Sequence, residues 1–424
     1  MNVPAGLSTE MCDMVIQTLK QVAARELPDS LLLELDEKDQ FPSDVIQKML
    51  SPDVGLHLIF LPENVGGLGG GARDICRVSE EMAKADLGVA TAFLAICLGT
   101  DPILVGGTDE QKMKWLSRIA SEGLIVAYGV TEPEAGSDVA SIQTTADHIT
   151  DADGNVTGYR LNGTKQFITN GGVAQLYTIL AKTPGGLSFF VVERDTPGLS
   201  VGVHEDKHGI RASNTTGVVM EDMEIPAENL ICGVEGQGLK QANAVFGYTR
   251  LMVGAFGLGG GQAPLERALA YAKTRMQFGA PIFEKQGYQF KLLVENWIDL
   301  AAGRAYAEQS SLTIDNGNHD LATEGSIAKY WCTEAGLRSA NCAIQALGGY
   351  GYTREYMVEK MYRDVRITTI YEGTSEIQQS IIGMYRWRQT VRSKGQFYED
   401  LAAKMDAVEA NNSGVGGQIG RAHV

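Results

Sequence analysis

The hydrophobic periodicity of this 424-residue chain changes twice, and this change constrains its fold more than any other feature. Residues 1–124 repeat apolar residues at helical spacing, as in MCDMVIQTLKQVAAREL. Residues 125–240 form short alternating segments separated by Asn-Gly, Gly-Gly and Pro-Gly turns, which predict an antiparallel β domain. Residues 241–385 return to four or five long helical segments. The order predicts an α+β fold with an N-terminal helical domain, a middle β domain and a C-terminal helical bundle.

The charge and the positions of cysteine and histidine argue against several functions. The net charge of −16 disfavours a nucleic-acid partner, because phosphate backbones are bound by clustered Lys and Arg. The six cysteines form no CxxC pair and the six histidines no ligand-spaced pair, so we expect reduced thiols, a cytoplasmic-type compartment and no metal site. The N-terminus lacks the basic start of a targeting segment. No run approaches the roughly 20 apolar residues that a membrane span requires.

One carboxylate stands in an unusual context. Glu372 follows the apolar run ITTIY and precedes Gly373 and a helix-like stretch. It is either a charge near the positive end of the following helix or a base held in a dry pocket. A carboxylate enclosed by apolar groups has a raised pKa, which makes it a better base. This segment alone leaves both interpretations open.

Two segments of the β region carry residues that suit a flat heterocycle or a phosphate. AYGVTEPEAGSD, residues 127–138, offers the hydroxyls of Thr131 and Ser137 and the close backbone approach that Gly136 permits. KQFITNGG, residues 165–172, places Phe167 and Thr169 on the same side of a strand. Each segment taken alone is more typical of a turn or a β core.

Three segments of the C-terminal region complete the set. KTRMQFGAPIFEKQ places Arg275 three residues before Phe278 on one helical face, ahead of a Gly-Ala-Pro turn. QALGGYGYTREY gathers glycines in a tight loop. GLGGGQ, residues 257–262, is similar to a dinucleotide fingerprint, but no strand precedes it, so we interpret it as close helix packing.

Together these segments resemble the acyl-CoA dehydrogenase family. YGVTEPEAGSD, KQFITNGG, RMQFGAPI, QALGGYGY and YRDVRITTIYEGTSEIQ occur in the order and approximate spacing of that family, and the resemblance covers most of the chain before residue 390. It implies a helical domain, a β-barrel-like domain and a four-helix bundle, with FAD between the β domain and the bundle. It also implies a homotetramer built as a dimer of dimers.

The resemblance assigns cofactor roles to residues of all these motifs. It implies that eight residues contact the FAD of their own subunit at the flavin or its pyrophosphate, with Thr374 beside the adenine: Tyr128, Val130, Thr131, Gly136, Ser137, Phe167, Thr169 and Thr374. Phe167 stands where relatives often carry Trp. It implies that four further residues contact the FAD of the neighbouring subunit: Arg275, Phe278, Gln345 and Gly349.

The resemblance also makes Glu372 the catalytic base that removes the α-proton of an acyl-CoA thioester, while the β-hydrogen leaves as a hydride. It assigns the hydrogen bonds to the thioester oxygen to the Glu372 backbone N–H and a flavin hydroxyl. Some relatives carry the base in the segment that reads FGYTRLM here, but this segment has no carboxylate. Further substrate contacts are implied for Ser137, Tyr371 and Gly373, and for Arg250 at the CoA portion.

The helix that contains DLGVATAFLAICLG is expected to line the acyl pocket, with four residues facing inward: Ala90, Phe93, Leu94 and Cys97. Relatives that act on glutaryl-CoA carry Arg where Ala90 aligns. Burial of a dicarboxylate end without a cation is costly, so we expect an uncharged acyl group.

We therefore expect an FAD-dependent acyl-CoA dehydrogenase of a bacterial cytoplasm that passes electrons to an electron-transfer flavoprotein. An oxygen-using acyl-CoA oxidase-like enzyme and a flavin-free CoA-binding protein stay open as alternatives. Residues 386–424 exceed the usual family end and contain one more amphipathic helix, GQFYEDLAAKMDAVEA. This extension packs across the tetramer or opens a further helical domain, and its last residues, NNSGVGGQIGRAHV, are expected to be disordered or cut short.

Overall fold

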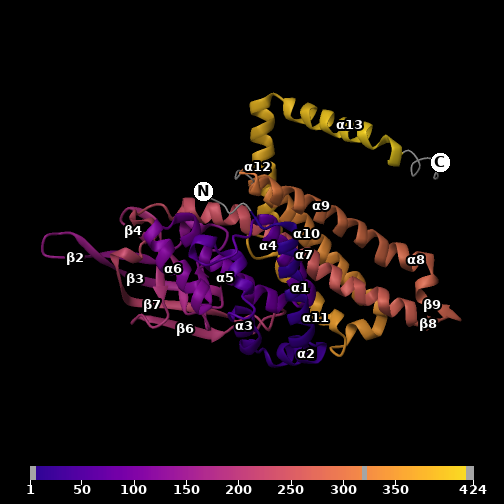
Figure 1. The fold of residues 1–424 in the computed structure, drawn as a ribbon, viewed down its shortest axis with the longest axis horizontal. Helices are drawn as coiled ribbons and strands as arrows, with labels where there is room; N and C mark the ends of the chain where they lie inside the picture. Colours follow the sequence, from indigo (N-terminus) through magenta and orange to yellow (C-terminus); the bar gives the residue numbers. More distant parts are fainter. Residues whose placement is uncertain (1–5, 318–321, 417–424) are drawn as a thin grey trace.

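The computed structural model describes residues 6–317 and 322–416, which form an elongated molecule with a β-sheet toward one end and long helices toward the other (Figure 1). The side chains of Ser8 and Thr108 cap two N-terminal helices, accepting N–H groups of Met11 and Gln111 at 3.2 Å each. The α-helices of the N-terminal region are α1 (Thr9–Glu26), α2 (Asp29–Lys38), α3 (Ser43–Leu50), α4 (Ala72–Ala85), α5 (Leu87–Gly106) and α6 (Asp109–Glu122).

Helix α5 is the central element of the N-terminal region. It has 20 residues and a mean hydropathy of 1.8, so by length and composition it is apolar enough to cross a membrane. This corrects our expectation that no run approaches such a length. Within the protein 83% of its apolar window is buried. The sheet holds it in place, because Asn170 and Thr178 donate hydrogen bonds to the carbonyls of Ala92 and Gly99, each at 2.8 Å.

The sheet has seven strands in the order β1-β4-β2-β3-β7-β6, with β5 paired to β4. Most neighbours are antiparallel, as predicted. However, β1 runs parallel to β4, and β2 meets β4 at one parallel pair, so the sheet is mixed. Alternation of apolar and polar residues carries no information on strand direction. The strands are β1 (Val126–Gly129), β2 (Thr145–Thr150), β3 (Val156–Thr169), β4 (Leu176–Thr183), β5 (Gly186–Glu193), β6 (Leu199–His204) and β7 (Thr215–Pro226).

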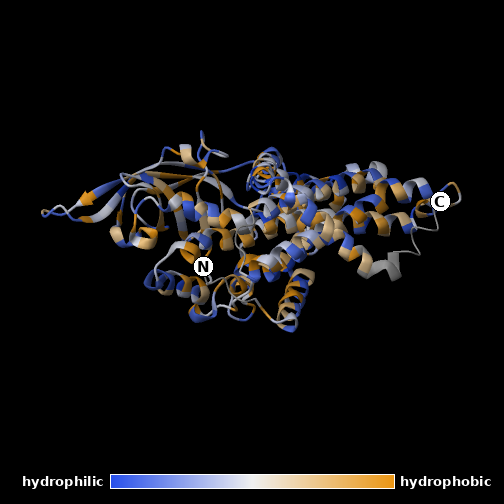
Figure 2. Cartoon of the chain, turned by 90° about the horizontal axis from the view of Figure 1, so that it is seen from above, coloured by the Kyte–Doolittle hydropathy of each residue, from blue (hydrophilic) through white to orange (hydrophobic). Residues whose placement is uncertain are grey.

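Four long helices form the C-terminal bundle, and in Figure 2 they carry hydrophobic and hydrophilic residues in alternating patches. A Cβ on Gly261 would lie 2.5 Å from the Gly336 Cα, and one on Gly257 only 2.6 Å from the Cys332 carbonyl oxygen. Two of the helices, α7 and α10, therefore approach closely, which confirms close helix packing as the role of GLGGGQ. The long helices are α7 (Gly238–Thr274), α9 (Glu295–Asp315), α10 (Ala322–Leu347) and α12 (Ser375–Ser393); the short elements are β8 (Met276–Gln277), β9 (Ala280–Pro281), α8 (Gln286–Tyr288) and α11 (Met357–Val365).

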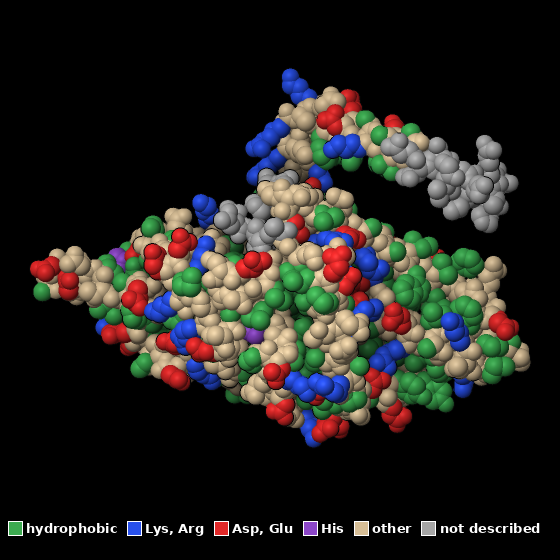
Figure 3. Space-filling model, viewed as in Figure 1, with side chains coloured by type: hydrophobic (Ala, Val, Ile, Leu, Met, Phe, Trp, Pro, Cys, Tyr) green, Lys and Arg blue, Asp and Glu red, His purple; other side chains and the backbone are tan. Residues whose placement is uncertain are grey.

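Helix α12 continues past residue 386, where we placed the start of the extension, and α13 (Gln396–Gly416) follows it. Figure 3 shows this arm standing clear of the body. The expected disordered or truncated end falls largely on residues 417–424, which lie outside the described residues. Four apolar side chains spaced along α13 are exposed: Tyr398, Leu401, Met405 and Val408.

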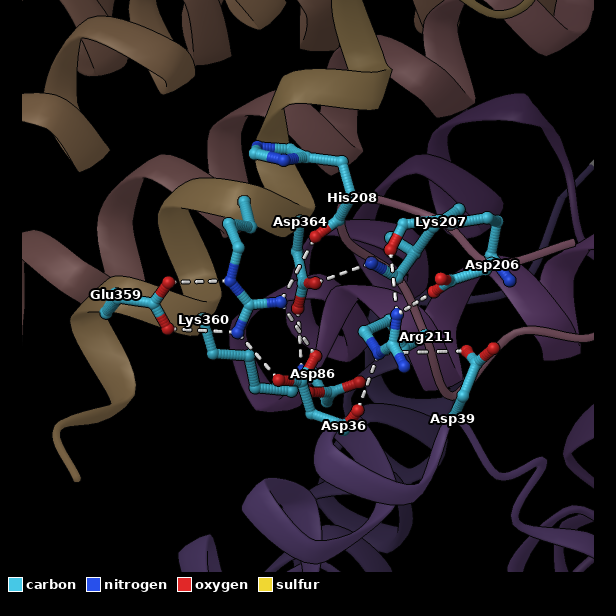
Figure 4. A network of polar contacts seen from close by, with 12 residues as sticks. Asp36, Asp39, Asp86, Asp206, Lys207, His208, Arg211, Glu359, Lys360 and Asp364 are labelled. Atoms are coloured by element: carbon cyan, nitrogen blue, oxygen red, sulfur yellow. Dashed lines mark hydrogen bonds and ion pairs between the residues drawn. The ribbon is translucent and has the colours of Figure 1, made fainter. Parts of the chain in front are cut away.

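A buried network of paired charges joins the three regions (Figure 4). Lys360 of α11 contacts the carboxylates of Asp86, which caps α5, and of Asp364, the latter at 2.6 Å. Asp364 also accepts the N–H of Ile210, from the segment between β6 and β7, at 2.6 Å. The network therefore fixes α5 relative to both the sheet and the bundle.

Candidate active site

Glu372 lies in a tight turn between a 3-10 segment, Arg366–Thr369, and α12. Its φ is 54° and that of Gly373 is 89°, so both residues are left-handed. For a residue other than glycine this conformation costs about 1–2 kcal/mol. Two buried side chains hold the turn: Lys329 Nζ donates to the Gly373 carbonyl at 2.8 Å, and Gln378 Nε2 donates to the Glu372 carbonyl at 2.9 Å. A strained residue that is held so firmly is typical of a functional site.

The Glu372 carboxylate is half-buried, and among the described residues its one hydrogen-bond donor is Thr249 of α7, whose Oγ1 donates to Oε2 at 2.9 Å. Burial raises the pKa of Glu372. The Thr249 bond and the positive charges of Arg250 and Lys329 oppose this rise. The direction of the shift is the one that a base acting near neutral pH requires.

Several polar groups around Glu372 have no hydrogen-bond partner among the described residues. The Glu372 backbone N–H is one of them. The others are Asp101 Oδ2, Tyr128 Oη and Arg250 Nε, all inaccessible to solvent. The charge of Glu372 acts on each of these three side chains, and together with burial it raises the pKa of Asp101 and of Tyr128. This part of the molecule thus presents unpaired donors and acceptors that a bound ligand could satisfy.

The acyl-pocket residues that we predicted form one stripe of α5. Ala90, Phe93 and Leu94 are completely buried, and Cys97 is 2% exposed. Positions three and four apart share a helix face, so the stripe continues to Asp101, which is 4% exposed. The stripe carries no Lys or Arg, and Asp101 is its one acidic residue.

The two flavin motifs of the β region lie next to each other. The Gln166 N–H donates to the Thr131 carbonyl at 2.9 Å, which joins the TEPEAGSD loop to the FIT segment. Gly136 and Ser137 are exposed in that loop, and a Cβ on Gly136 would meet nothing within 4 Å. Phe167 sits at a β-bulge with a φ of 57° and is 63% exposed.

The remaining residues of that set differ in exposure. Val130 is buried and Tyr128 is half-buried, with its ring stacked 5.7 Å from that of Phe189. Thr169 is half-buried at the end of β3. Thr374 caps α12.

A second predicted set lies at the far end of the bundle (Figure 1). Arg275 ends α7, and its Cζ lies 5.5 Å from the ring of Tyr350, which brings it to the glycine loop that contains Gly349. Phe278 does not share a helical face with Arg275 as we expected. It lies at the tip of the β8–β9 hairpin with a φ of 53°, because α7 ends before it, and it is 94% exposed. Gln345 is exposed near the end of α10.

Both sets fit a cofactor that has a flat ring and phosphates. Exposed aromatic rings at strained positions suit stacking, and a Cβ on Gly136 or Gly349 would enter open space, so the backbone is accessible to phosphate oxygens. The sets lie far apart in one chain (Figure 1). FAD that contacts both would therefore lie between two copies of the chain.

Sequence reasoning missed three residues of this site. Lys329 is a lone lysine in the small-residue helix EGSIAKYWC, and Asp101 is the lone acid of an apolar helix. A charge in an otherwise apolar stripe is the signal that could have identified both residues. Gln378 gives no such signal, because its role depends on the turn that precedes α12.

A hollow of about 230 Å³ elsewhere on the surface contains none of the predicted site residues. It lies beside α1, α4 and α9, and several of the charges in its walls already pair with one another. Arg304 contacts Glu80 at 2.5 Å, and Arg73 contacts Glu308 at 3.0 Å. It therefore offers fewer polar atoms without a hydrogen-bond partner than the surroundings of Glu372 do.

The fold and this site define a flavin-dependent oxidoreductase. Residues 9–123, 127–223 and 236–385 match the N-terminal, middle and C-terminal domains of acyl-CoA dehydrogenases. The chain belongs to the acyl-CoA dehydrogenase family, whose members use FAD. The predicted family, fold class, enzyme class and cofactor are thereby confirmed.

The similarity extends over nearly the full length of each of the following relatives. An acyl-CoA dehydrogenase of Bacillus subtilis is 37% identical over 378 residues, which cover 88% of this chain and 97% of that protein. The butyryl-CoA dehydrogenase structure from Megasphaera elsdenii has a TM-score of 0.83 at 34% identity and covers 90% of this chain and 99% of its own. A chain from a structure of the electron transferring flavoprotein of Acidaminococcus fermentans has a TM-score of 0.83 at 32% identity, with coverage of 90% and 99%.

Proposed function

We propose that this acyl-CoA dehydrogenase converts an uncharged acyl-CoA thioester to the trans-2-enoyl-CoA, with Glu372 as the base that removes the α-proton. One observation carries the proposal: a half-buried carboxylate with a raised pKa is held on a strained turn beside its own unused backbone N–H. A charge that merely caps α12 would not need this conformation, and the Thr374 side chain already caps that helix.

Glu372 and the residues around it have separate roles in removal of the α-proton. The Glu372 carboxylate accepts the α-proton, and the Thr249 hydroxyl orients it through Oε2. The free Glu372 N–H donates to the thioester oxygen, where negative charge develops as the proton leaves. Lys329 and Gln378 keep that N–H and the carboxylate in place by holding the two carbonyls of the turn. Substrate that displaces water from this half-buried site strengthens these interactions.

The two sets of residues described above would hold the cofactor. The TEPEAGSD loop and the FIT segment would contact it from one subunit, and Arg275, Phe278, Gln345 and Gly349 from the neighbouring one. FAD, when bound, supplies the acceptor for the β-hydrogen as hydride. Ser137, Tyr371 and Gly373 are proposed to border the thioester, and Arg250 the CoA portion.

The division of the flavin set between two ends of the chain supports a homotetramer built as a dimer of dimers. The exposed apolar residues of α13 support packing of the extension across that assembly. The likeness to a chain in the Acidaminococcus fermentans electron transferring flavoprotein structure supports an electron-transfer flavoprotein as the acceptor. A cytoplasmic location stays a prediction.

An anaerobic titration tests the proposal. The purified holoprotein is mixed with straight-chain and branched acyl-CoA thioesters, and we expect the flavin absorbance to bleach. Glu372→Gln should slow bleaching by roughly 100-fold or more, whereas Glu376→Gln, which changes an exposed acid four residues away, should not. Normal bleaching in Glu372→Gln would exclude Glu372 as the base. Stoichiometric peroxide in air would favour oxygen as the acceptor, and a protein without flavin would exclude the reaction.

A further inference from the structure

Asp101 is a buried acid that the proposed chemistry does not use. Its side chain is 4% exposed. One oxygen, Oδ1, accepts a long bond from Cys97 Sγ at 3.9 Å, and a thiol is a weak donor. The other oxygen, Oδ2, has no partner among the described residues. A buried acceptor left in this state costs about 1–3 kcal/mol, so its presence calls for an explanation.

Asp101 lies on the same face of α5 as residues of the predicted acyl wall. Ala90, Leu94, Cys97 and Asp101 are separated by four, three and four residues, so they lie along one face of the helix. The first three belong to the predicted acyl wall. Asp101 is therefore the polar end of an otherwise apolar stripe.

Electrostatic interactions link Asp101 to the base and to Tyr128, which belongs to β1, the strand that packs on α5. The charge of Glu372 acts on it and, after burial, is the second cause that raises the pKa of Asp101. Asp101 also acts on the Tyr128 phenol, whose Oη is buried and likewise unpaired. Burial and the Glu372 charge both raise the pKa of Asp101, which favours its neutral form.

We propose that Asp101, with Tyr128 beside it, forms a polar subsite in the acyl pocket that binds a hydrogen-bonding O–H or N–H group on the acyl chain. This inference rests on the proposed function and narrows its substrate class. A neutral acid and a phenol can both donate and accept, so they can satisfy a hydroxyl completely. An unsubstituted alkyl chain would leave both groups buried and unpaired, which binding sites reject.

The test compares matched pairs of product-type ligands, which have no α,β hydrogen pair left to lose. trans-2-Enoyl-CoA thioesters of four to six carbons are compared with their ω-hydroxy and ω-amino counterparts on the holoenzyme, and affinities are measured by calorimetry. We expect tighter binding of the substituted ligand at one chain length. The hydroxy and amino arms show which donor the subsite takes. Asp101→Leu should reverse the preference, so that the unsubstituted ligand binds roughly tenfold or more tightly. In this variant the hydroxyl or amine of the substituted ligand is the buried polar group without a partner, which costs about 1–3 kcal/mol.

Two variants separate a subsite from a structural role. Thr100→Val removes the neighbouring buried hydroxyl, which bonds to the Ile96 carbonyl at 2.7 Å, and should leave the preference unchanged. Asp101→Asn keeps donor and acceptor capacity and should keep the preference for the hydroxy ligand. An unchanged ratio in folded Asp101→Leu, or no preference in the wild type at any length, would overturn the subsite. Failure of bleaching with every acyl-CoA would instead overturn the proposed reaction, because these affinities do not depend on turnover.

Discussion

Two buried polar clusters of this molecule differ in how their charges are satisfied. In the network around α11, Lys360 contacts Asp86 and Asp364, and Arg363 contacts Asp36 at 2.6 Å (Figure 4). Each of these charges has an opposite charge within reach. In the cluster around Glu372, by contrast, the carboxylate has one hydroxyl partner, and three neighbouring polar atoms have none among the described residues.

The difference separates architecture from function. Buried charges that are fully paired hold elements together, and removal of one partner leaves an uncompensated charge. Buried polar groups without partners lower stability and persist where a ligand completes their bonds. We therefore expect substitutions in the α11 network to damage folding, and substitutions in the Glu372 cluster to change chemistry or specificity with little loss of stability.

The largest effect is expected from Lys360→Met. It leaves the buried carboxylates of Asp86 and Asp364 without their shared cation, which should lower the free energy of unfolding by about 3–5 kcal/mol. Denaturant titration of the holoprotein measures this loss. Lys38→Met, at an exposed pair with Glu34, is the control and should leave the unfolding free energy nearly unchanged. Equal effects of the two variants would contradict the role of the network.

Asp101→Leu should change the free energy of unfolding in the opposite direction. It replaces an unpaired buried acid by an apolar side chain of similar size, so the free energy of unfolding should rise by about 1–3 kcal/mol in the absence of substrate. The pKa of Asp101 is raised in the folded state. The cost of Asp101 to stability is therefore smallest below the unfolded pKa and grows as pH rises from there through the folded pKa. The advantage of the variant should grow with pH; a destabilised Asp101→Leu would show that the acid is structural.

The order of the three regions could be predicted from sequence because helix and strand have different periods, and a local pattern reports each one. The direction of β1 could not, since alternation is the same in parallel and antiparallel pairs. Glu372 stood out because its apolar neighbours and Gly373 are adjacent in sequence. The hydrogen bond from Lys329 that holds its turn could not be predicted. Lys329 lies 44 residues from Gly373 in sequence and reaches it only once α10 and α12 are packed.

The third prediction concerns the bond that holds the base. Thr249→Val removes the hydroxyl that donates to Glu372 Oε2, and this bond lowers the pKa of Glu372. The pKa of Glu372 should therefore rise. Since the reaction needs the ionised carboxylate, the rate increases with pH through this pKa, and the acid limb of the bleaching rate should move to higher pH. Stopped-flow bleaching across pH measures it. Thr249→Ser keeps the hydroxyl and should keep the limb; an unchanged limb in Thr249→Val would exclude the bond as a determinant.

The smallest shift is expected from Lys329→Met. The Lys329 charge also lowers the pKa of Glu372, but less than the Thr249 bond or the Arg250 charge does. The acid limb should move in the same direction as in Thr249→Val, by a smaller amount. Burial lowers the pKa of Lys329 to about 8, so in the wild type the effect of its charge should weaken above that pH, and the bleaching rates of the two proteins should converge there.

Loss of the bond to the Gly373 carbonyl should also lower the free energy of unfolding by about 1 kcal/mol. Lys404→Met, on the exposed face of α13, should change neither quantity. A limb that moves to lower pH would mean that Lys329 acts on Glu372 through the turn conformation rather than through its charge.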